Sequence, residues 1–144
     1  MPDGRTFQYS IITPERVLAE GRAEFVAIPG HDGQFGVMHS RAPFLCKLAP
    51  GIVRLRHADE EEWFFVSGGF AHVFRNRLLV LAPKALTAEQ VDRQQAEAAL
   101  AEATSMKITD EASLRRRAQA IAAAKAMLKL AAFAVVTGRK SDAG

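Results

Sequence analysis

The sequence predicts a β-sandwich or barrel of short strands, followed by an antiparallel hairpin of two α-helices. Between residues 7 and 82, apolar residues occur in short runs separated by Gly, Pro, Asn or acidic residues, as is typical of many short strands. From residue 87 to 137 there is neither Gly nor Pro, and Ala, the strongest helix former, is abundant. The chain has 144 residues, 49% of them hydrophobic, so it can bury a core. We expect a β-sandwich domain over residues 1–86 and a two-helix domain over 87–144 with a flexible C-terminal tail.

Nine segments of the first domain have the pattern of strands. In segment 51–57 the apolar residues alternate with Arg54 and Arg56, as expected where one face of a strand is buried. The acidic run 59–62 and the pair Arg75–Asn76 are expected to form exposed hairpin turns. Strands this short must form two sheets that cover each other's apolar faces. The expected strands are Phe7–Thr13, Arg16–Ala19, Ala23–Ile28, Gln34–Val37, Phe44–Leu48, Gly51–His57, Glu62–Ser67, Gly69–Phe74 and Leu78–Ala82.

Two N-terminal capping signals divide the second domain into two helices. Thr87 and Gln90 have the spacing of a capping box, so a helix is expected over about 88–103. Thr109, followed by two acidic residues, is expected to cap a second helix that ends near Val136. This second helix carries an apolar stripe that another part of the protein should cover, and the stripe comprises Leu114, Ala118, Ile121, Leu128, Ala132 and Val135.

Basic residues are concentrated in the second helix. Segment 109–140 carries a net charge of +5, whereas the first helix carries −3, and this asymmetry favours antiparallel pairing. The basic side chains of the second helix could face solvent, bind an acidic protein or bind nucleic acid. No aromatic residues are interleaved with them, unlike in a surface that stacks single-stranded bases, and the whole chain carries only +3.

The sequence contains no group of residues that would form an active site, a metal site or a cofactor site. The four histidines lie in or beside different strands, and Cys46 is the single cysteine. Gly30, Gly33 and Gly36 match neither a dinucleotide-binding nor a Walker motif. We therefore expect no enzyme and no cofactor. The free cysteine, the lack of an export signal and the lack of an apolar run of about 18 residues indicate a cytoplasmic protein that reaches membranes only through partners.

Two stretches resemble one family in the order and spacing of their motifs. IPGHDGQFGVMHSRAPFLCKLAPGIVRL, residues 28–55, contains spaced glycines, an x-A-P motif and a P-G-x-x-R motif. WFFVSGGFAHVFRNRLLVLAPKAL, residues 63–86, contains an S-G-G strand pair and a closing strand. With the helical hairpin, these features resemble the epsilon subunit of the F-type ATP synthase, called delta in mitochondria, over nearly all of residues 6–136. The resemblance implies a ten-stranded β-sandwich with a two-helix carboxyl domain, and no catalytic activity.

The resemblance also implies a place at the foot of the rotor in a bacterial ATP synthase. There the sandwich would contact the gamma subunit and the c-ring, and would couple proton-driven rotation to ATP synthesis. In bacterial members the carboxyl helices can extend along gamma, meet the beta subunit and block ATP hydrolysis. The protein would be peripheral, held by the complex at the cytoplasmic face of the inner (plasma) membrane, without nucleic acid and without an inserted segment.

Functional residues follow from the same resemblance. The residue before Ala-Pro is commonly histidine in the family and is Arg41 here, and His39 stands where proline is common, so contacts with gamma are expected to differ locally. The expected c-ring loop is His31, Asp32, Gly33 and Gln34, and the expected gamma-facing segment is His39, Ser40 and Arg41. The expected regulatory residues of the second helix are Arg115, Arg116, Arg117, Lys125 and Lys129.

Some bacterial members bind ATP between the two helices through an Ile/Leu-Asp-x-x-Arg-Ala motif and a later Arg-Ala-x-x-Arg motif. Here residues 91–96 read VDRQQA, with Gln95 in place of arginine, and the later motif reads KAMLK. By this resemblance, Asp92, Lys125 and Lys129 are the expected residues of a degenerate ATP site. Because lysine lacks the planar fork with which arginine binds phosphate, we expect nucleotide binding to be weak or absent.

Two other classes of function stay open on the sequence alone. A β-sandwich can be a carbohydrate- or peptide-binding module, although binding clefts are usually rich in aromatic residues, and Trp63 and Tyr9 are the only Trp and Tyr. A protein that binds nucleic acid through the basic helix would show steep salt dependence and would need no rotor partner. Co-purification with gamma distinguishes the three classes.

Overall fold

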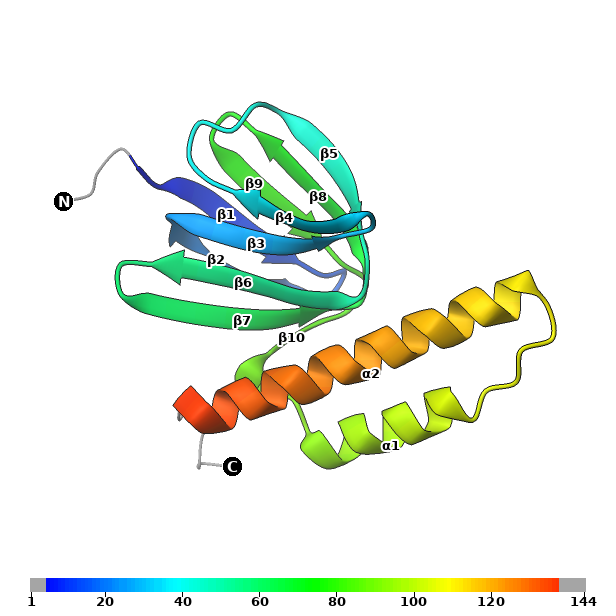
Figure 1. Ribbon diagram of the computed structural model, residues 1–144. Helices are drawn as coiled ribbons and strands as arrows, with labels where there is room; N and C mark the ends of the chain where they lie inside the picture. The colour runs from blue at the N-terminus through cyan, green and yellow to red at the C-terminus, as the bar shows by residue number, and fades with distance from the viewer. Residues whose placement is uncertain (1–4, 138–144) are drawn as a thin grey trace.

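The computed structural model describes residues 5–137, which form ten strands, one 3-10 turn and two α-helices. The expected β-sandwich followed by a helical hairpin is confirmed (Figure 1). The expected flexible tail lies outside these residues. The strands are β1 Phe7–Ile12, β2 Val17–Ala23, β3 Phe25–Gly30, β4 Gly33–Val37, β5 Phe44–Leu48, β6 Gly51–His57, β7 Glu60–Val66, β8 Gly69–Phe74, β9 Arg77–Leu81 and β10 Ala85–Thr87.

The strands follow one continuous hydrogen-bonded path that folds into two layers. Their order is β10-β7-β6-β3-β5-β8-β9-β1-β2, with β4 paired to β3. The path passes from one layer to the other between β3 and β5, which share only the pair Gly30–Leu48. One layer is therefore β4-β3-β6-β7-β10, and the other is β5-β8-β9-β1-β2 (Figure 1). The main core lies between the layers, where side chains such as Phe7, Ile28 and Val80 are almost fully buried.

The observed strands differ from the expected ones at three places. β2 continues to Ala23, because it pairs with β1 along nearly its whole length, although Gly21 and its polar neighbours have the composition of a turn. Only Asp59 of the acidic run lies in the β6–β7 turn, because Glu60–Glu62 belong to β7 and pair with β6. The strand β10 has only three residues, which is too short to show an alternating pattern in the sequence.

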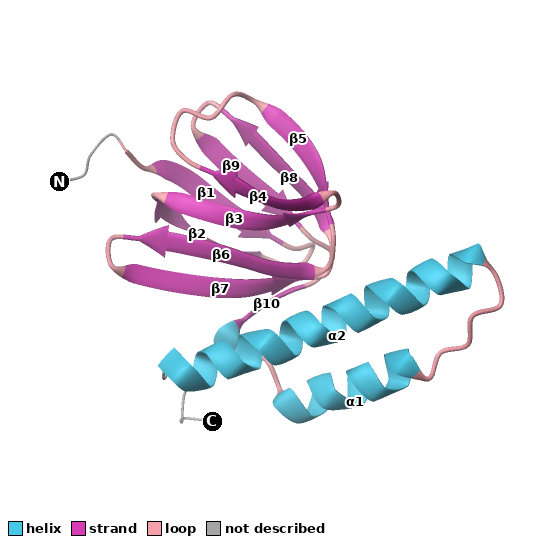
Figure 2. Cartoon of the chain, in the orientation of Figure 1, coloured by secondary structure: helices cyan, strands magenta, loops and turns pink. Residues whose placement is uncertain are grey.

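The two helices are α1, Arg93–Thr104, and α2, Glu111–Thr137, and they lie side by side as an antiparallel pair (Figure 2). No helix in the described part of the chain is both long enough and apolar enough to cross a membrane.

The expected start of the first helix is wrong. The Gln90 side chain accepts a hydrogen bond from the Thr87 N–H at 2.9 Å, as the capping-box prediction requires, but this pair encloses only the 3-10 turn Ala88–Gln90. The α-helix begins later, where Asp92 Oδ1 accepts hydrogen bonds from the N–H groups of Gln94 and Gln95 at 2.9 and 3.3 Å. The chain has two capping signals five residues apart, and the second one begins the helix.

The second helix is capped by Asp110 and not by Thr109. Asp110 Oδ1 accepts a hydrogen bond from the Ser113 N–H at 2.8 Å, and Ser113 Oγ accepts one from the Asp110 N–H at 3.0 Å. This reciprocal pair satisfies backbone donors of the first turn. Hydrogen bonding by Ser113, chiefly from its N–H to the carboxylate, lowers the pKa of Asp110 because it favours the charged form.

A second core cluster attaches α2 to the outer side of the first layer. Ile52 and Phe65 of that layer pack against a group of α2 residues centred on Leu130. The Trp63 ring stacks on Phe133, with ring centroids 4.2 Å apart and an interplanar angle of 6°. The second half of α2 therefore connects the hairpin to the sandwich.

The expected apolar stripe does not describe the buried face of α2. Leu114 is 47% exposed, and Ala118 and Ala132 are also exposed, while Ile121 and Leu128 are only half-buried. The side chain of Val135 lies outside the described residues. Small side chains let α2 approach its neighbours closely, and hydropathy alone underrates them. The buried residues of α2 in its second half are Ala124, Ala126, Leu130, Ala131 and Ala134.

Candidate partner-binding surfaces

The two layers of the sandwich differ in what covers their outer sides. The hairpin covers β6 and β7, whereas in the described part of the chain no helix lies over β5, β8, β9, β1 and β2 (Figure 1). We call the outer side of these five strands the open face. Leu45, Phe70 and Leu81 are 67%, 50% and 45% exposed on it, and Phe70 lies directly opposite Leu81 in the β8–β9 pair. Exposed apolar side chains gathered on one sheet face are typical of a surface that binds another macromolecule.

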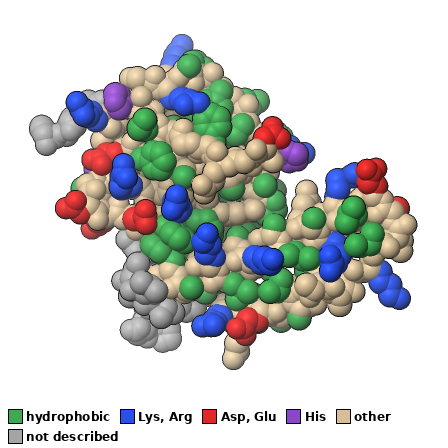
Figure 3. Space-filling model, viewed as in Figure 1, with side chains coloured by type: hydrophobic (Ala, Val, Ile, Leu, Met, Phe, Trp, Pro, Cys, Tyr) green, Lys and Arg blue, Asp and Glu red, His purple; other side chains and the backbone are tan. Residues whose placement is uncertain are grey.

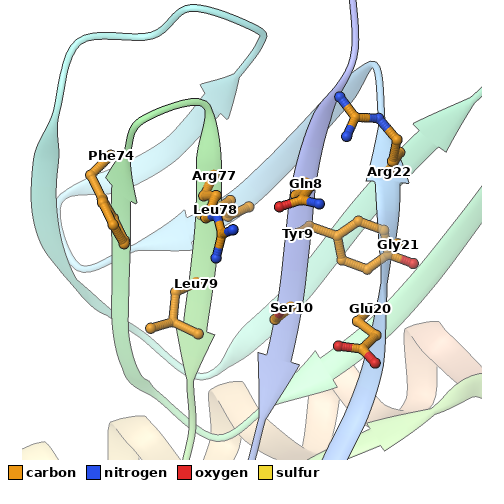
Figure 4. Close-up of a pocket in the computed structure, with 10 residues that line it drawn as sticks. All are labelled: Gln8, Tyr9, Ser10, Glu20, Gly21, Arg22, Phe74, Arg77, Leu78 and Leu79. Atoms are coloured by element: carbon orange, nitrogen blue, oxygen red, sulfur yellow. The ribbon is translucent and has the colours of Figure 1, made fainter. Parts of the chain in front are cut away.

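The open face has a hollow at each end. An apolar groove of about 450 Å³ lies at the end where β8 begins, and it is lined by Ile12, Thr13, Pro14, Gly69, Phe70, Leu81, Ala82 and Pro83. A more polar cleft of about 430 Å³ lies at the other end (Figure 4). Its charged side chains are Glu20, Arg22 and Arg77, and Arg22 Nε donates a hydrogen bond to Thr6 Oγ1 at 2.9 Å. The open face thus has an apolar end and a charged end.

The residues expected to meet the c-ring form the turn between β3 and β4, His31 and Asp32, and the first two residues of β4, Gly33 and Gln34. The His31 N–H donates to the Lys47 carbonyl oxygen at 2.8 Å, which fixes the turn to β5. His31 Nδ1 lies 3.5 Å from Asp32 Oδ1, and both side chains are well exposed. Gly33 has a φ of 132°, which other residues rarely adopt, and Gln34 is exposed. The turn therefore presents a carboxylate and an imidazole to solvent.

The residues expected to meet gamma lie in the connection between β4 and β5. Ser40 has a φ of 61°, and its N–H donates to Asn76 Oδ1 at 2.8 Å. His39 Nδ1 lies 3.3 Å from Ser40 Oγ, and His39 is exposed. Arg41 places its guanidinium over two aromatic rings. These residues and the preceding Met38 are called the 38–41 segment. The hydrogen bond to Asn76 places it beside the β8–β9 turn and so at the polar end of the open face.

The structure does not bring the two expected interfaces together. The turn 31–34 and the 38–41 segment lie at opposite ends of β4 (Figure 1). At about 3.3 Å per residue, the intervening strand separates them by roughly 15 Å. The open face extends between the two ends, so the sandwich can contact different partners at each end.

The three consecutive arginines of α2 have different surroundings, since successive helical residues point about 100° apart. Arg115 Nη1 lies 4.0 Å from Glu111 Oε1, one turn earlier. Arg117 Nη2 donates to the Thr104 carbonyl oxygen at 3.1 Å, so it holds the end of α1. Arg116 is exposed and forms no ion pair with a residue of the described chain. Figure 3 shows Lys and Arg side chains along α2 on the viewed face.

The residues of the expected ATP site are placed as follows. The Asp92 carboxylate caps α1, and Lys125 and Lys129 are exposed one turn apart on α2. ATP binding by this set stays a prediction.

The side chains that could carry other chemistry are not arranged as an active site. Residues 5–137 contain no cluster of three or more His, Cys, Asp or Glu that could hold a metal ion. Burial raises the pKa of the Cys46 thiol. Burial, together with the charge of Glu62, also raises the pKa of the Tyr9 hydroxyl. Both groups therefore stay protonated at neutral pH.

Sequence reasoning missed the open face. A signal was present, because β9 has the consecutive apolar residues Leu78–Leu81, and such a run places apolar side chains on both faces of a strand. In a two-layer fold only one of these faces points into the main core. The sequence pattern does not distinguish an outer face of β9 that is covered by another part of the chain from one that is covered by a partner.

Comparisons with known proteins identify the family. Residues 6–88 match the family model described as the ATP synthase delta/epsilon chain, β-sandwich domain. The ATP synthase epsilon chain of Rhodopirellula baltica is 38% identical over 76% of this chain and 91% of its own. That of Rhodospirillum rubrum is 35% identical over 85% and 94%. A chain in the structure of the Euglena gracilis mitochondrial ATP synthase, OSCP/F1/c-ring, has the same fold, with a TM-score of 0.74 and 21% identity over 92% of this chain and 84% of its own. The chain therefore belongs to the delta/epsilon family, the non-catalytic rotor-stalk subunits of the F-type ATP synthase.

Proposed function

We propose that this chain connects the c-ring to the gamma subunit and thereby couples proton-driven rotation to ATP synthesis. The c-ring would meet the turn 31–34, and gamma would bind the open face together with the 38–41 segment. The chain would be held by the complex at the cytoplasmic side of the inner membrane, with no inserted segment and no bound nucleic acid.

The open face is the observation that carries this proposal. A stalk subunit must rotate with its neighbour without slipping, and a broad apolar contact with a charged rim provides such a connection. Leu45, Phe70 and Leu81 supply the apolar part of this contact, and the polar cleft around Arg77 supplies a charged edge at one end of it. In the other layer, α2 covers the outer sides of β6 and β7.

A charge placed in the open face tests the proposal. Phe70→Glu should lower the affinity for purified gamma at least tenfold, because the new carboxylate would be desolvated without a partner. Leu114→Glu is the comparison variant, because it places the same charge at a residue that is 47% exposed on α2, outside the open face, and so separates binding through this face from a contact of the hairpin with gamma. Gamma co-purification and a binding titration measure both variants. Wild-type affinity in Phe70→Glu would show that gamma does not use this face.

We further propose that the hairpin regulates ATP hydrolysis by leaving the sandwich and contacting gamma and beta. The separation of the two core clusters supports this, because α2 can detach without opening the space between the layers. Arg115, Arg116, Lys125 and Lys129 are exposed and supply positive charge for an acidic segment of beta. Arg117 takes part only if its bond to Thr104 is given up.

Hydrolysis by the assembled enzyme tests this regulatory role. A chain that ends at Gln90 retains all ten strands and should release the inhibition. Replacing both Arg115 and Arg116 with Glu should raise hydrolysis several-fold and leave synthesis nearly unchanged, because exposed ion pairs contribute only about 0–1 kcal/mol each. Equal hydrolysis with the full chain, the double variant and the shortened chain would restrict the hairpin to a structural role.

A further inference from the structure

Arg41 lies on a pair of stacked aromatic rings at the corner where the two layers meet. The rings of Phe35 on β4 and Phe44 on β5 have centroids 4.6 Å apart and an interplanar angle of 16°. The Arg41 guanidinium carbon is 4.5 Å from the Phe35 centroid and 5.3 Å from the Phe44 centroid. In the described chain no carboxylate forms an ion pair with Arg41, so the rings are its observed partners. A planar guanidinium suits this position, since it both stacks on aromatic rings and is attracted to their faces.

The stack of Arg41 on the two rings holds the connection between β4 and β5, which no hydrogen bonds between these two strands hold. β4 pairs only with β3, and β5 pairs with β8 and at one position with β3, so no ladder joins β4 to β5 in the described structure. The chain between them must cross from one layer to the other. Arg41 belongs to this connection, and its stack ties the connection to one residue from each of the two strands that it joins.

A second contact holds the preceding residue. Ser40 has a left-handed φ of 61°, a conformation that non-glycine residues rarely adopt without support. The support comes from Asn76, whose Oδ1 accepts the Ser40 N–H at 2.8 Å and whose Nδ2 donates to the Thr6 carbonyl oxygen at 3.0 Å. Two successive residues are thus fixed, and the two residues before them, Met38 and His39, are left exposed.

We propose that Arg41 is a positioning residue for the gamma interface. Its planar guanidinium, packed on Phe35 and Phe44, holds the 38–41 segment in the shape in which Met38 and His39 contact gamma, and gamma does not recognise the charge of Arg41. This inference rests on the proposed function. It differs from the expectation that all of residues 39–41 contact gamma directly.

Substitutions that separate charge from planarity test the inference in binding titrations with purified gamma. Lysine keeps the charge but cannot lie flat over two rings, whereas histidine keeps a planar ring and loses the permanent charge. Arg41→Lys and Arg41→Gln should therefore both weaken gamma binding, by about two- to tenfold, which is the range of a stacked planar contact, because neither side chain covers both rings as the guanidinium does. Arg41→His should bind like the wild type, and the salt dependence of binding should be the same in all variants. The control is Arg75→Asn, which removes a neighbouring charge at a position where the φ of 49° suits Asn.

A double-mutant cycle of His39 and Arg41 gives a second test. It measures the coupling between the two residues in gamma binding, which a general loss of stability would not change. His39→Ala should weaken binding less in the Arg41→Gln background than in the wild type, because the segment is no longer held in place. Additive effects, or an Arg41→Lys variant that binds like the wild type while Arg41→Gln does not, would overturn the positioning role. Absence of gamma binding by the wild type itself would overturn the proposed function as well, so the two failures are distinguishable.

Discussion

Gly69 is held in a conformation that no other residue fits. Its φ is 106°, and a Cβ at this position would overlap the Leu81 carbonyl oxygen and lie 2.9 Å from Ala82 Cα. Both obstacles are backbone atoms of the neighbouring strand, which cannot move without breaking the β8–β9 pair. The S-G-G motif predicts a kink or a bulge here, but only the structure shows which of the two glycines is sterically required, since Gly68 has no neighbour closer than 3.5 Å.

Gly69→Ala should therefore destabilise the protein by about 3 kcal/mol or more, because backbone strain and a backbone clash add. Gly33→Ala is the matched comparison, since Gly33 also has a positive φ, 132°, but no atom within 4 Å of the added Cβ. It should cost only the strain, about 1–2 kcal/mol. Urea unfolding of the two variants measures the difference. Equal losses would mean that β9 shifts to make room at Gly69.

The residues that the sequence predicts well are those whose chemistry is local. Arg75 and Asn76 form the expected tight turn, with φ values of 49° and 60°, because the two-residue hairpin requires this backbone and Asn tolerates it. The stack of Arg41 on Phe35 could not be predicted in the same way. Its partners are brought together only by the passage of the chain from one layer to the other.

At the scale of elements, alternation predicts most strands, whereas the packing of α2 is decided by residues that carry little hydropathy signal. The pattern of large residues places Leu114 on the buried face, but the structure buries the face that contains Leu130 and several alanines. Helical periodicity shows that one side of α2 is apolar. It does not show which side of α2 meets the sheet. That side depends on the outward-facing sheet residues Ile52 and Phe65, which only the folded structure identifies.

The same substitution at two positions of α2 measures this difference. Leu130 is fully buried at the contact with the sandwich, so Leu130→Ala should destabilise the protein by about 2–4 kcal/mol through lost burial and the cavity left behind. Leu114→Ala should change stability by no more than about 0.5 kcal/mol, because that side chain is 47% exposed. Thermal or urea unfolding compares them. The opposite ranking would restore the stripe that includes Leu114 as the buried face.

At the scale of the whole molecule, the protein consists of a sandwich with its own core and a hairpin attached from outside. The main cluster fills the space between the layers, and the second cluster lies between the first layer and α2. The strands β6 and β7 contribute to both clusters, with different side chains to each. Detaching α2 would therefore expose Ile52, Trp63 and Phe65 but leave the interior of the sandwich closed. We therefore propose that docking of the hairpin is an equilibrium separate from folding of the sandwich.

Trp63 reports this equilibrium directly, because it is the only tryptophan of the chain and its ring stacks on Phe133 of α2. Phe133→Ala removes the stacked ring, so the emission of Trp63 should move to longer wavelength and become more accessible to a soluble quencher. The far-ultraviolet signal of the strands should persist, because the main core contains neither residue. Phe70→Ala is the control, since it removes an exposed aromatic ring on the open face, away from the hairpin, and should leave the emission unchanged. If the wild type already emits and is quenched like Phe133→Ala, the hairpin is detached in solution and needs a partner to hold it. If only Phe133→Ala shows the shift, the docked hairpin is the resting state, and any partner that extends α2 must supply the free energy of this contact.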